Sequence, residues 1–158
     1  MAVRACLIPF LQDGSPPGGH AGLMTTTTRT DPGAWPTLSY RDAEAALRYL
    51  VEVVGFTESA VMRGDADRPV AHAELLWPAG GGIMFGTAKK DDSPFSKRTP
   101  GTASVYLVTD DPDRLYARAT AAGAEVIREL NDTDYGSREF SVRDPEGNIW
   151  SFGTYAGA

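Results

Sequence analysis

The fold is decided by two stretches of the chain that repeat one another, LLWPAGGGIMFGT at residues 75–87 and VRDPEGNIWSFGT at residues 142–154. At this constant offset of 67 residues, five of the thirteen positions are identical, and three of these five are consecutive. Average amino-acid usage would give about one match by chance. Because self-similarity at a fixed spacing indicates a duplicated structural unit, we expect residues from 34 onward to contain two versions of one unit.

The first unit reads as a strand, a helix and three further strands. Asp42 is a suitable N-cap for the helix, and Gly55 is a suitable left-handed residue to end it. The apolar residues that recur between them at helical spacing are Leu47, Leu50, Val51 and Val54. The alternation of apolar residues and the positions of turn formers predict strands at residues 36–40, 56–62, 70–77 and 82–87.

The second unit has the same order of elements. Asp111 followed by Pro112 predicts the start of a helix that runs to Ala122, and Gly123 ends it. The predicted strands are residues 104–109, 125–129, 138–143 and 148–155. The sequence DPEG at residues 144–147 makes the last hairpin turn, where Arg138 and Asp144 are expected to be structural.

The remaining segments divide the chain into parts. Residues 34–88 form the first module, residues 89–100 a polar linker and residues 101–158 the second module, within one domain that spans residues 34–156. Residues 1–33 are rich in Gly, Pro and Thr and lack apolar periodicity, so we expect a disordered leader without a function. Met24 offers an alternative start within this leader.

The paired units and the segment YGSREFSVRDPEGNIW at residues 135–150 together resemble the vicinal-oxygen-chelate superfamily of glyoxalases, bleomycin-resistance proteins and extradiol dioxygenases. The resemblance covers residues 35–155. It implies an α+β fold in which two tandem βαβββ modules form curled mixed sheets around a cavity, with the helices outside. It also makes a homodimer plausible, because members of this family commonly dimerise.

The alternation of side chains along each strand assigns them to two faces. The large apolar residues belong under the helices: Leu38, Tyr40, Ile83, Phe85, Val105, Leu107, Phe140, Val142, Trp150 and Phe152. The intervening residues are then expected to face the cavity and to bind a ligand: Trp35, Thr37, His72, Glu74, Met84, Ser104, Tyr106, Glu139, Ser141 and Ser151.

The family resemblance places metal ligands at four positions, which hold Trp35, Met84, Ser104 (or Ala103, after a shift of one residue) and Ser151 in this chain. None of these is a good ligand for a divalent transition metal. The chain has only two histidines, and His20 lies in the leader. We therefore expect no metal and no cofactor. An unorthodox metal site made by His72, Glu74 and Glu139 is the alternative.

The bulk composition limits the partners. The net charge of −6 argues against nucleic acid, because phosphate binding needs clustered Lys and Arg. The single cysteine, Cys6, allows no disulfide within the chain, and the apolar run at residues 5–11 is too short to span a membrane. The short run is not followed by a signal-peptide cleavage pattern, so the expected location is cytoplasmic.

The resemblance and the residues together support three hypotheses about function. The favoured one is a metal-free protein that binds a drug or metabolite in the inter-module cavity without catalysis, as in antibiotic resistance. The second is a lyase or isomerase in which His72 and Glu74 act as acid and base or hold an atypical metal. The third is a regulatory or structural homodimer without catalysis. Trp77, just before a tight turn, is expected at a ligand mouth, at a dimer contact or in simple packing.

Overall fold

The computed structural model describes residues 33–89 and 91–157. The predicted leader, residues 1–33, lies outside the described residues except for Gly33, and the same holds for Cys6 and His20. Within the described ranges, no helix combines the length and the apolar character that crossing a bilayer requires.

The elements follow the predicted order in both modules. The first module contains β1 (Thr37–Tyr40), α1 (Ala43–Tyr49), the π-helix η1 (Leu50–Val54), β2 (Thr57–Arg63), β3 (Val70–Leu76) and β4 (Gly82–Thr87). The second module contains β5 (Ser104–Val108), α2 (Pro112–Ala121), β6 (Glu125–Asp132), β7 (Arg138–Arg143) and β8 (Ile149–Gly153).

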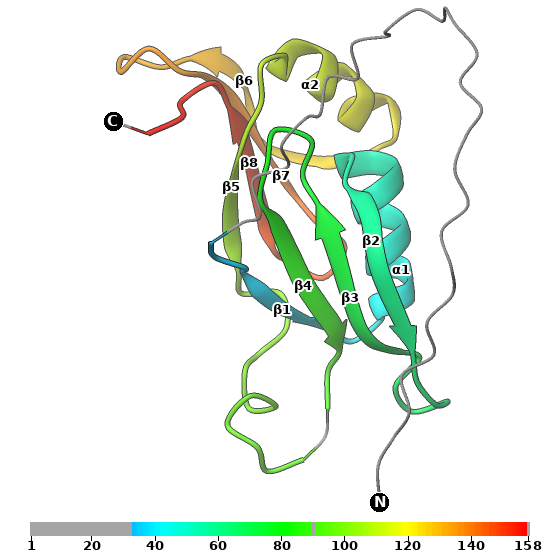
Figure 1. Ribbon diagram of the computed structural model, residues 1–158. Coiled ribbons are helices and arrows are strands. Elements are labelled where there is room, and N and C mark those ends of the chain that lie inside the picture. Colours follow the sequence, from blue (N-terminus) through cyan, green and yellow to red (C-terminus); the bar gives the residue numbers. More distant parts are fainter. Residues whose placement is uncertain (1–32, 90, 158) are drawn as a thin grey trace, which may run out of the picture.

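Each module forms one four-stranded mixed sheet. The strand orders are β1-β4-β3-β2 and β5-β8-β7-β6, so the two sheets repeat the same topology. In each sheet the first strand pairs in parallel with the last, and the other pairings are antiparallel. Figure 1 shows the two sheets as separate layers that do not close into one barrel, and α1 and α2 pack on the core side of their sheets. This arrangement confirms the predicted α+β fold of two tandem modules.

The first helical segment differs from the prediction in its second half. Asp42 caps α1 as expected, since its carboxylate accepts the N–H of Ala45 at 2.9 Å, and Gly55 ends the segment at a φ of 108°. Between them the chain changes from an α-helix to the π-helix η1. The N–H groups of Gly55 and Phe56 both donate to the carbonyl of Leu50, so the last turn is wider than an α-turn.

A contact from the other module accompanies this wide turn. The guanidinium of Arg118, on α2, donates to the carbonyl of Val51 at 2.8 Å and to that of Glu52 at 2.7 Å. These carbonyls belong to the end of a helix, where intrahelical partners run out. The second module therefore satisfies the end of the first helix, which apolar periodicity within one module does not predict.

The second module agrees with the prediction at its helix and extends it at one strand. The Asp111 carboxylate caps α2 by accepting the N–H of Arg114 at 3.0 Å, and Gly123 has a φ of 76°. Strand β6 continues to Asp132, beyond the predicted end at residue 129. The extension arises because Asn131 and Asp132 pair with Glu139 and Arg138 of β7.

The two modules share one hydrophobic core, which lies on the helix side of both sheets. Rings of different modules meet there, since Phe56 lies 5.8 Å from Trp150 and Trp77 lies 6.0 Å from Phe152, between ring centroids. Nine of the ten predicted core residues are buried and the tenth, Val105, is half-buried. Trp77 itself is buried and donates its Nε1–H to the carbonyl of Val108 at 2.6 Å, which agrees with a role in packing.

Asp144 fastens the last hairpin turn and the junction between the modules. One oxygen of its buried carboxylate accepts the N–H groups of residues 146–148. The other accepts the side-chain N–H groups of Asn148 and Trp150, and also the hydroxyl of Tyr40, from the first module, at 2.8 Å. The structural role predicted for Asp144 is confirmed, and it extends beyond its own turn.

Candidate functional site

The face of the first sheet that points away from the core carries five of the predicted ligand residues. His72 and Glu74 lie on β3, and His72 Nε2 lies 3.0 Å from Glu74 Oε1. Both side chains are about one third exposed, at 37% and 31%. Glu74 is also the cross-strand partner of Met84, and Met84 is the partner of Thr37. The prediction that these four residues share one face agrees with this register.

A cavity of about 310 Å³ lies over this face. Its wall includes Thr37, His72 and Met84, and the segment between the modules contributes Ser93 and Phe95. The same segment is tied to β1, because the guanidinium of Arg98 donates to the carbonyl of Thr37 at 2.7 Å. A segment that was predicted only as a polar linker therefore covers part of the first sheet.

Trp35 precedes β1 and lies over a glycine of β4. A Cβ added to Gly82 would come within 2.5 Å of the indole ring of Trp35. The absence of a side chain at Gly82 therefore lets the indole approach the backbone of the strand closely. This places Trp35 beside the first sheet, as expected, although it is absent from the wall of the 310 Å³ cavity.

The equivalent face of the second sheet carries the other five predicted residues. The hydroxyls of Ser141 and Ser151 lie 2.9 Å apart across β7 and β8. Ser104 is exposed near the start of β5, and Tyr106 is 41% exposed on the same strand. A Cβ on Gly153 would collide with the hydroxyl of Tyr106, so the tyrosine side chain crosses the backbone at this glycine.

Glu139 is the one fully buried carboxylate among the predicted residues. It is only 2% exposed, and its Oε1 accepts the hydroxyl of Tyr135 at 2.7 Å and a guanidinium N–H of Arg128. Its Oε2 is buried and has no hydrogen-bond partner among the described residues. Sequence reasoning missed Arg128 and Tyr135 as neighbours of this group. The available signal was the position of Tyr135 in the quoted family segment and of Arg128 on the adjacent strand.

The structure thus separates the ten predicted residues into two groups of five. The wall of the 310 Å³ cavity contains no residue of the second module. Among the described residues, no three His, Cys, Asp or Glu side chains lie close enough together to hold a metal ion. Within one chain, the described residues His72, Glu74 and Glu139 therefore do not come together as the unorthodox three-ligand site considered from the sequence. The reason is that His72 and Glu139 belong to different sheets.

The four positions that the family resemblance assigns to a metal also fail on their donor chemistry. Trp35 offers no lone pair for a metal, Met84 offers a thioether, and Ser151 offers a hydroxyl already bonded to Ser141. Ser104 adds one exposed hydroxyl. Divalent metals in such sites select imidazole, thiolate or carboxylate ligands. These residues do not fit a resident divalent metal.

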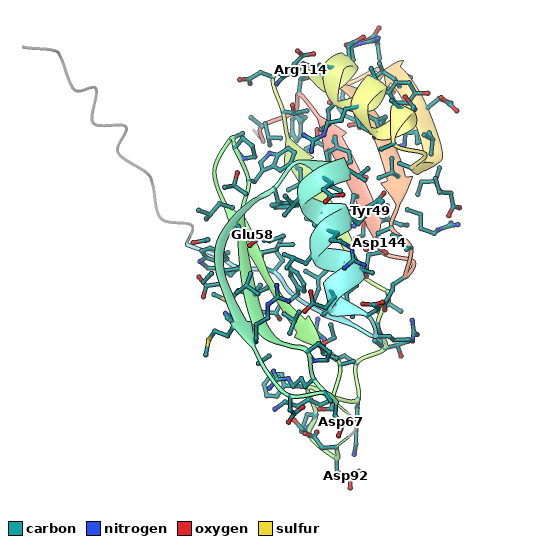
Figure 2. The ribbon with its side chains drawn as sticks, turned by 90° about the vertical axis from the view of Figure 1, so that its right-hand side faces the viewer. Tyr49, Glu58, Asp67, Asp92, Arg114 and Asp144 are labelled. Atoms are coloured by element: carbon teal, nitrogen blue, oxygen red, sulfur yellow. The ribbon has the colours of Figure 1, made fainter. Side chains whose placement is uncertain are left out.

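Two further cavities lie between the modules, away from the faces predicted to bind ligand. One of about 450 Å³ is lined by residues at the end of η1 and along α2, including Trp77, Arg114 and Arg118. The other, of about 230 Å³, has Tyr40, Tyr49 and Asp144 in its wall. Figure 2 shows Tyr49 and Asp144 close to one another beside α1, and Arg114 at the opposite end of the molecule from Asp67 and Asp92.

Burial controls the titration of the tyrosines at this junction. Burial, followed by the charges of Asp144 and Glu125, raises the pKa of Tyr49 to about 12. Burial also raises the pKa of Tyr40, and the Asp144 carboxylate that accepts its hydroxyl raises it further. Both phenols are therefore neutral hydrogen-bond donors at ordinary pH, which suits a structural role at the junction.

Comparison with curated proteins finds relatives in mycobacteria. The uncharacterized protein Rv0887c of Mycobacterium tuberculosis strain H37Rv is 30% identical over 138 residues, which cover 82% of this chain and 78% of the relative. A putative glyoxylase, CFP32, of Mycobacterium bovis is 31% identical over 136 residues. That match covers 84% of this chain but 47% of the relative, so the chain spans about half the length of CFP32.

Comparison with solved structures finds the same fold. TioX from Micromonospora sp. ML1 is 31% identical with a TM-score of 0.63, and the match covers 77% of this chain and 98% of TioX. A glyoxalase/bleomycin resistance protein from Streptomyces sp. CB03234 is 24% identical with a TM-score of 0.56, covering 75% of this chain and 98% of that protein. The latter similarity shows the fold alone.

The family model for the Glyoxalase/Bleomycin resistance protein/Dioxygenase superfamily matches residues 34–152. This range contains both sheets and both helices and ends inside β8. The chain belongs to the Glyoxalase/Bleomycin resistance protein/Dioxygenase superfamily.

Proposed function

We propose that this protein binds a small organic molecule, a drug or a metabolite, on the polar faces of its sheets without a metal and without catalysis. The observation that carries the proposal is the chemistry of the four positions to which the family resemblance assigns metal ligands. Trp35, Met84 and Ser151 offer aromatic, thioether and hydroxyl contacts there. Such contacts suit a ligand with apolar and hydrogen-bonding parts, because small-molecule sites combine apolar walls with a few placed polar groups.

The cavity over the first sheet supports this proposal. Its volume of about 310 Å³ lies at the lower end of the range of ligand pockets, roughly 300 to 1,000 Å³. Met84 and Phe95 supply apolar contacts, while Thr37 and His72 supply hydrogen-bonding groups. Phe95 is 78% exposed, so a ligand that covers its ring would remove apolar surface from water.

A homodimer would enlarge this site. The shared core joins the modules through their helix sides and leaves both polar faces outside it. In a two-fold dimer, the first sheet of one copy can face the second sheet of the other, which creates two equivalent cavities. We propose this arrangement, in the cytoplasm, as the form that binds ligand and that would serve in antibiotic resistance if the ligand is a drug.

A lyase or isomerase is the second candidate function. It is favoured by the His72–Glu74 pair, whose atoms lie 3.0 Å apart with His72 in a cavity wall. A carboxylate beside an imidazole can transfer a proton to or from a substrate carbon. The 31% identity to a protein named as a putative glyoxylase points in the same direction.

The test combines three measurements on the purified, untagged protein. Elemental analysis reports bound metal, thermal denaturation against a library of drugs and metabolites reports binding, and mass spectrometry of the hits reports turnover. A ligand at one hundred times its Kd should add about 2.7 kcal/mol to the free energy of unfolding. The proposal predicts stabilisation that persists with chelator, without chemical change of the ligand.

The variants separate the two candidates. Met84→Arg should abolish stabilisation by ligand because it fills the cavity, whereas Asp67→Ala, in the exposed turn between β2 and β3, should not change it. His72→Ala should leave binding largely intact under the favoured proposal. Stoichiometric metal or turnover that disappears in His72→Ala would instead establish the enzyme. A tight dimer that no compound stabilises would point to the regulatory or structural role.

A further inference from the structure

One corner of the second sheet gathers three tyrosines around the buried carboxylate of Glu139. The corner lies where the turn between β6 and β7 runs beside the chain after β8, which Figure 1 shows as the orange hairpin next to the red C-terminal segment. We call it the Glu139 site and define it by Tyr106, Arg128, Tyr135, Ser137, Glu139 and Tyr155.

The carboxylate of Glu139 is incompletely satisfied. Oε1 accepts two donors, from Tyr135 and Arg128, whereas Oε2 is buried with no partner among the described residues. Buried polar atoms normally have a hydrogen-bond partner, because desolvation without one costs free energy. The carboxylate therefore has the capacity for one more donor, although Oε2 itself is covered by the chain in this arrangement.

The surroundings of Glu139 are aromatic and open to solvent. Tyr106, Tyr135 and Tyr155 are 41%, 58% and 46% exposed, and the rings of Tyr135 and Tyr155 meet edge to face with centroids 6.1 Å apart. The hydroxyl of Tyr106 lies 3.4 Å from Ser137 Oγ and accepts the N–H of Tyr155 at 3.2 Å. Exposed aromatic faces next to a carboxylate attract cations.

Arg128 shows that a cation is accepted at this carboxylate. Its guanidinium pairs with Glu139, and its side chain is 51% exposed, whereas that of Glu139 is only 3% exposed. Arg128 can therefore move into water, but the buried carboxylate then needs another cation in its place. A second Arg–Glu pair joins the same two strands, Arg143 on β7 with Glu125 on β6. In that pair both side chains are about half exposed, at 44% and 58%, and no tyrosine hydroxyl bonds the carboxylate among the described contacts.

We propose that the Glu139 site recognises the cationic group of a ligand, a primary ammonium or an amidinium carried on an aromatic body, and that Arg128 occupies the site when the ligand is absent. The inference rests on the proposed small-molecule binding and names the ligand class for it. The ligand cation donates to Glu139 and lies against the tyrosine rings, while the aromatic body extends over Tyr106 toward Ser141 and Ser151. Arg128 moves outward and becomes fully hydrated.

The test compares charged and neutral probes of the same shape. Benzamidine is matched with benzamide and benzylamine with benzyl alcohol, and binding to the full chain is followed by the chemical shifts of the tyrosine ring protons. The wild-type protein should bind each cation about tenfold more tightly than its neutral partner, the usual size of one charge-assisted hydrogen bond. Equal affinities within each matched pair would overturn the inference.

Two variants and one control test whether the preference for cationic probes arises at Glu139. Glu139→Gln should remove the preference for cations and leave the neutral probes unchanged. Arg128→Gln should raise the affinity for benzamidine several-fold, because it removes the internal competitor. Glu125→Gln, in the exposed pair on the same strands, should change neither affinity. If Glu139→Gln does not fold, Arg128→Gln and the matched probes still test the inference. A lower affinity of Arg128→Gln for benzamidine would contradict the role of Arg128 as an internal competitor.

The outcomes also separate this inference from the proposed function. Library compounds that stabilise the protein while cations and neutral probes bind alike would reject the Glu139 site and retain small-molecule binding. Failure of the whole library, the cationic probes included, would reject both.

Discussion

The two modules keep the same core face and differ on the opposite face. At the offset of 67 residues, Phe85 and Phe152 are equivalent, and both are buried against the shared core. The cross-strand pair Glu74–Met84 of the first sheet is equivalent to Ser141–Ser151 of the second. Period-two alternation lets one face of a strand vary while the other holds the fold. The duplication therefore supplies the scaffold, and differences on the polar faces supply specificity.

The turns before the last strands differ in the same way. Trp77 and Asp144 occupy equivalent positions, and each ties its module to the other. Trp77 does so with an indole in the core and one bond to Val108, whereas Asp144 uses a buried carboxylate with six donors. One junction is mainly apolar and the other is polar, which allows each to be disturbed separately.

Asp144→Ala should have the largest effect on stability. It removes the acceptor from the hydroxyl of Tyr40, the indole N–H of Trp150 and the N–H groups of the turn, all at a buried position. We expect the free energy of unfolding to fall by about 3 to 5 kcal/mol. Urea unfolding followed by tryptophan fluorescence measures this. Asp67→Ala, at an exposed turn, should change it by less than about 0.5 kcal/mol.

Trp77→Phe should cost less, about 2 to 3 kcal/mol, because it shortens a buried ring and leaves the carbonyl of Val108 without its donor. The same unfolding experiment measures it. Trp35→Phe is the control, since Trp35 is half-buried beside the polar face and lies outside the core. Equal losses in the two variants would contradict the view that the first turn anchors the modules.

Gly153→Ala tests the contrast between the polar faces and should cost about 1 to 2 kcal/mol. The new methyl group would meet the hydroxyl of Tyr106, whereas at the equivalent Gly86 it would meet the backbone carbonyl of Ala71 at 2.9 Å. Tyr106→Phe should therefore recover part of the loss in Gly153→Ala and none in Gly86→Ala. A double-mutant cycle by urea unfolding measures the coupling, and additive effects of Gly153→Ala and Tyr106→Phe would contradict the packing of Tyr106 over this glycine.

The sequence alone predicted the order of strands and helices along the chain, the residues that start and end the helical segments, and the two faces of each strand, because these depend on local signals such as Asp42, Gly55 and the period-two alternation. The repeat, together with the segment at residues 135–150, supported the resemblance to a known superfamily in which two such modules are paired. What it did not predict depends on contacts between distant segments. The π-helix η1 accompanies Arg118 from the other module, and the burial of Glu139 depends on Tyr135 and Arg128.

The candidate site shows the same division between features that local signals predict and features that depend on distant contacts. Alternation placed ten side chains on the polar faces, yet it could not show whether one chain brings both faces together. That depends on which sides of the sheets join, and the joining is decided by rings such as Phe56 and Trp150 packing across the modules. A single strand pattern contains no information about such a contact.

The smallest predicted effect concerns the helix tyrosines at equivalent positions, Tyr49 and Tyr116. Burial raises the pKa of Tyr49 to about 12, whereas a hydrogen bond to Glu129 is the main cause that raises the pKa of the exposed Tyr116 hydroxyl. An unfolded tyrosine titrates near pH 10, at about the usual value. Below that pH both states keep the proton of Tyr49. Between about pH 10 and 12 the unfolded state loses it while the folded state retains it, so stability falls as pH rises.

Urea unfolding midpoints at about pH 9 and about pH 11 therefore test whether burial of Tyr49 at the junction links its proton to the stability of the fold. Tyr49→Phe should lose less stability between these two pH values than the wild-type protein, because one linked proton is gone. Some loss should remain, since burial also raises the pKa of Tyr40. Tyr116→Phe should change the alkaline loss less than Tyr49→Phe, because solvent screens the bond to Glu129. If Tyr116→Phe reduced the alkaline loss of stability more than Tyr49→Phe, the tyrosine whose proton is linked to folding would be in the second module, contrary to this prediction.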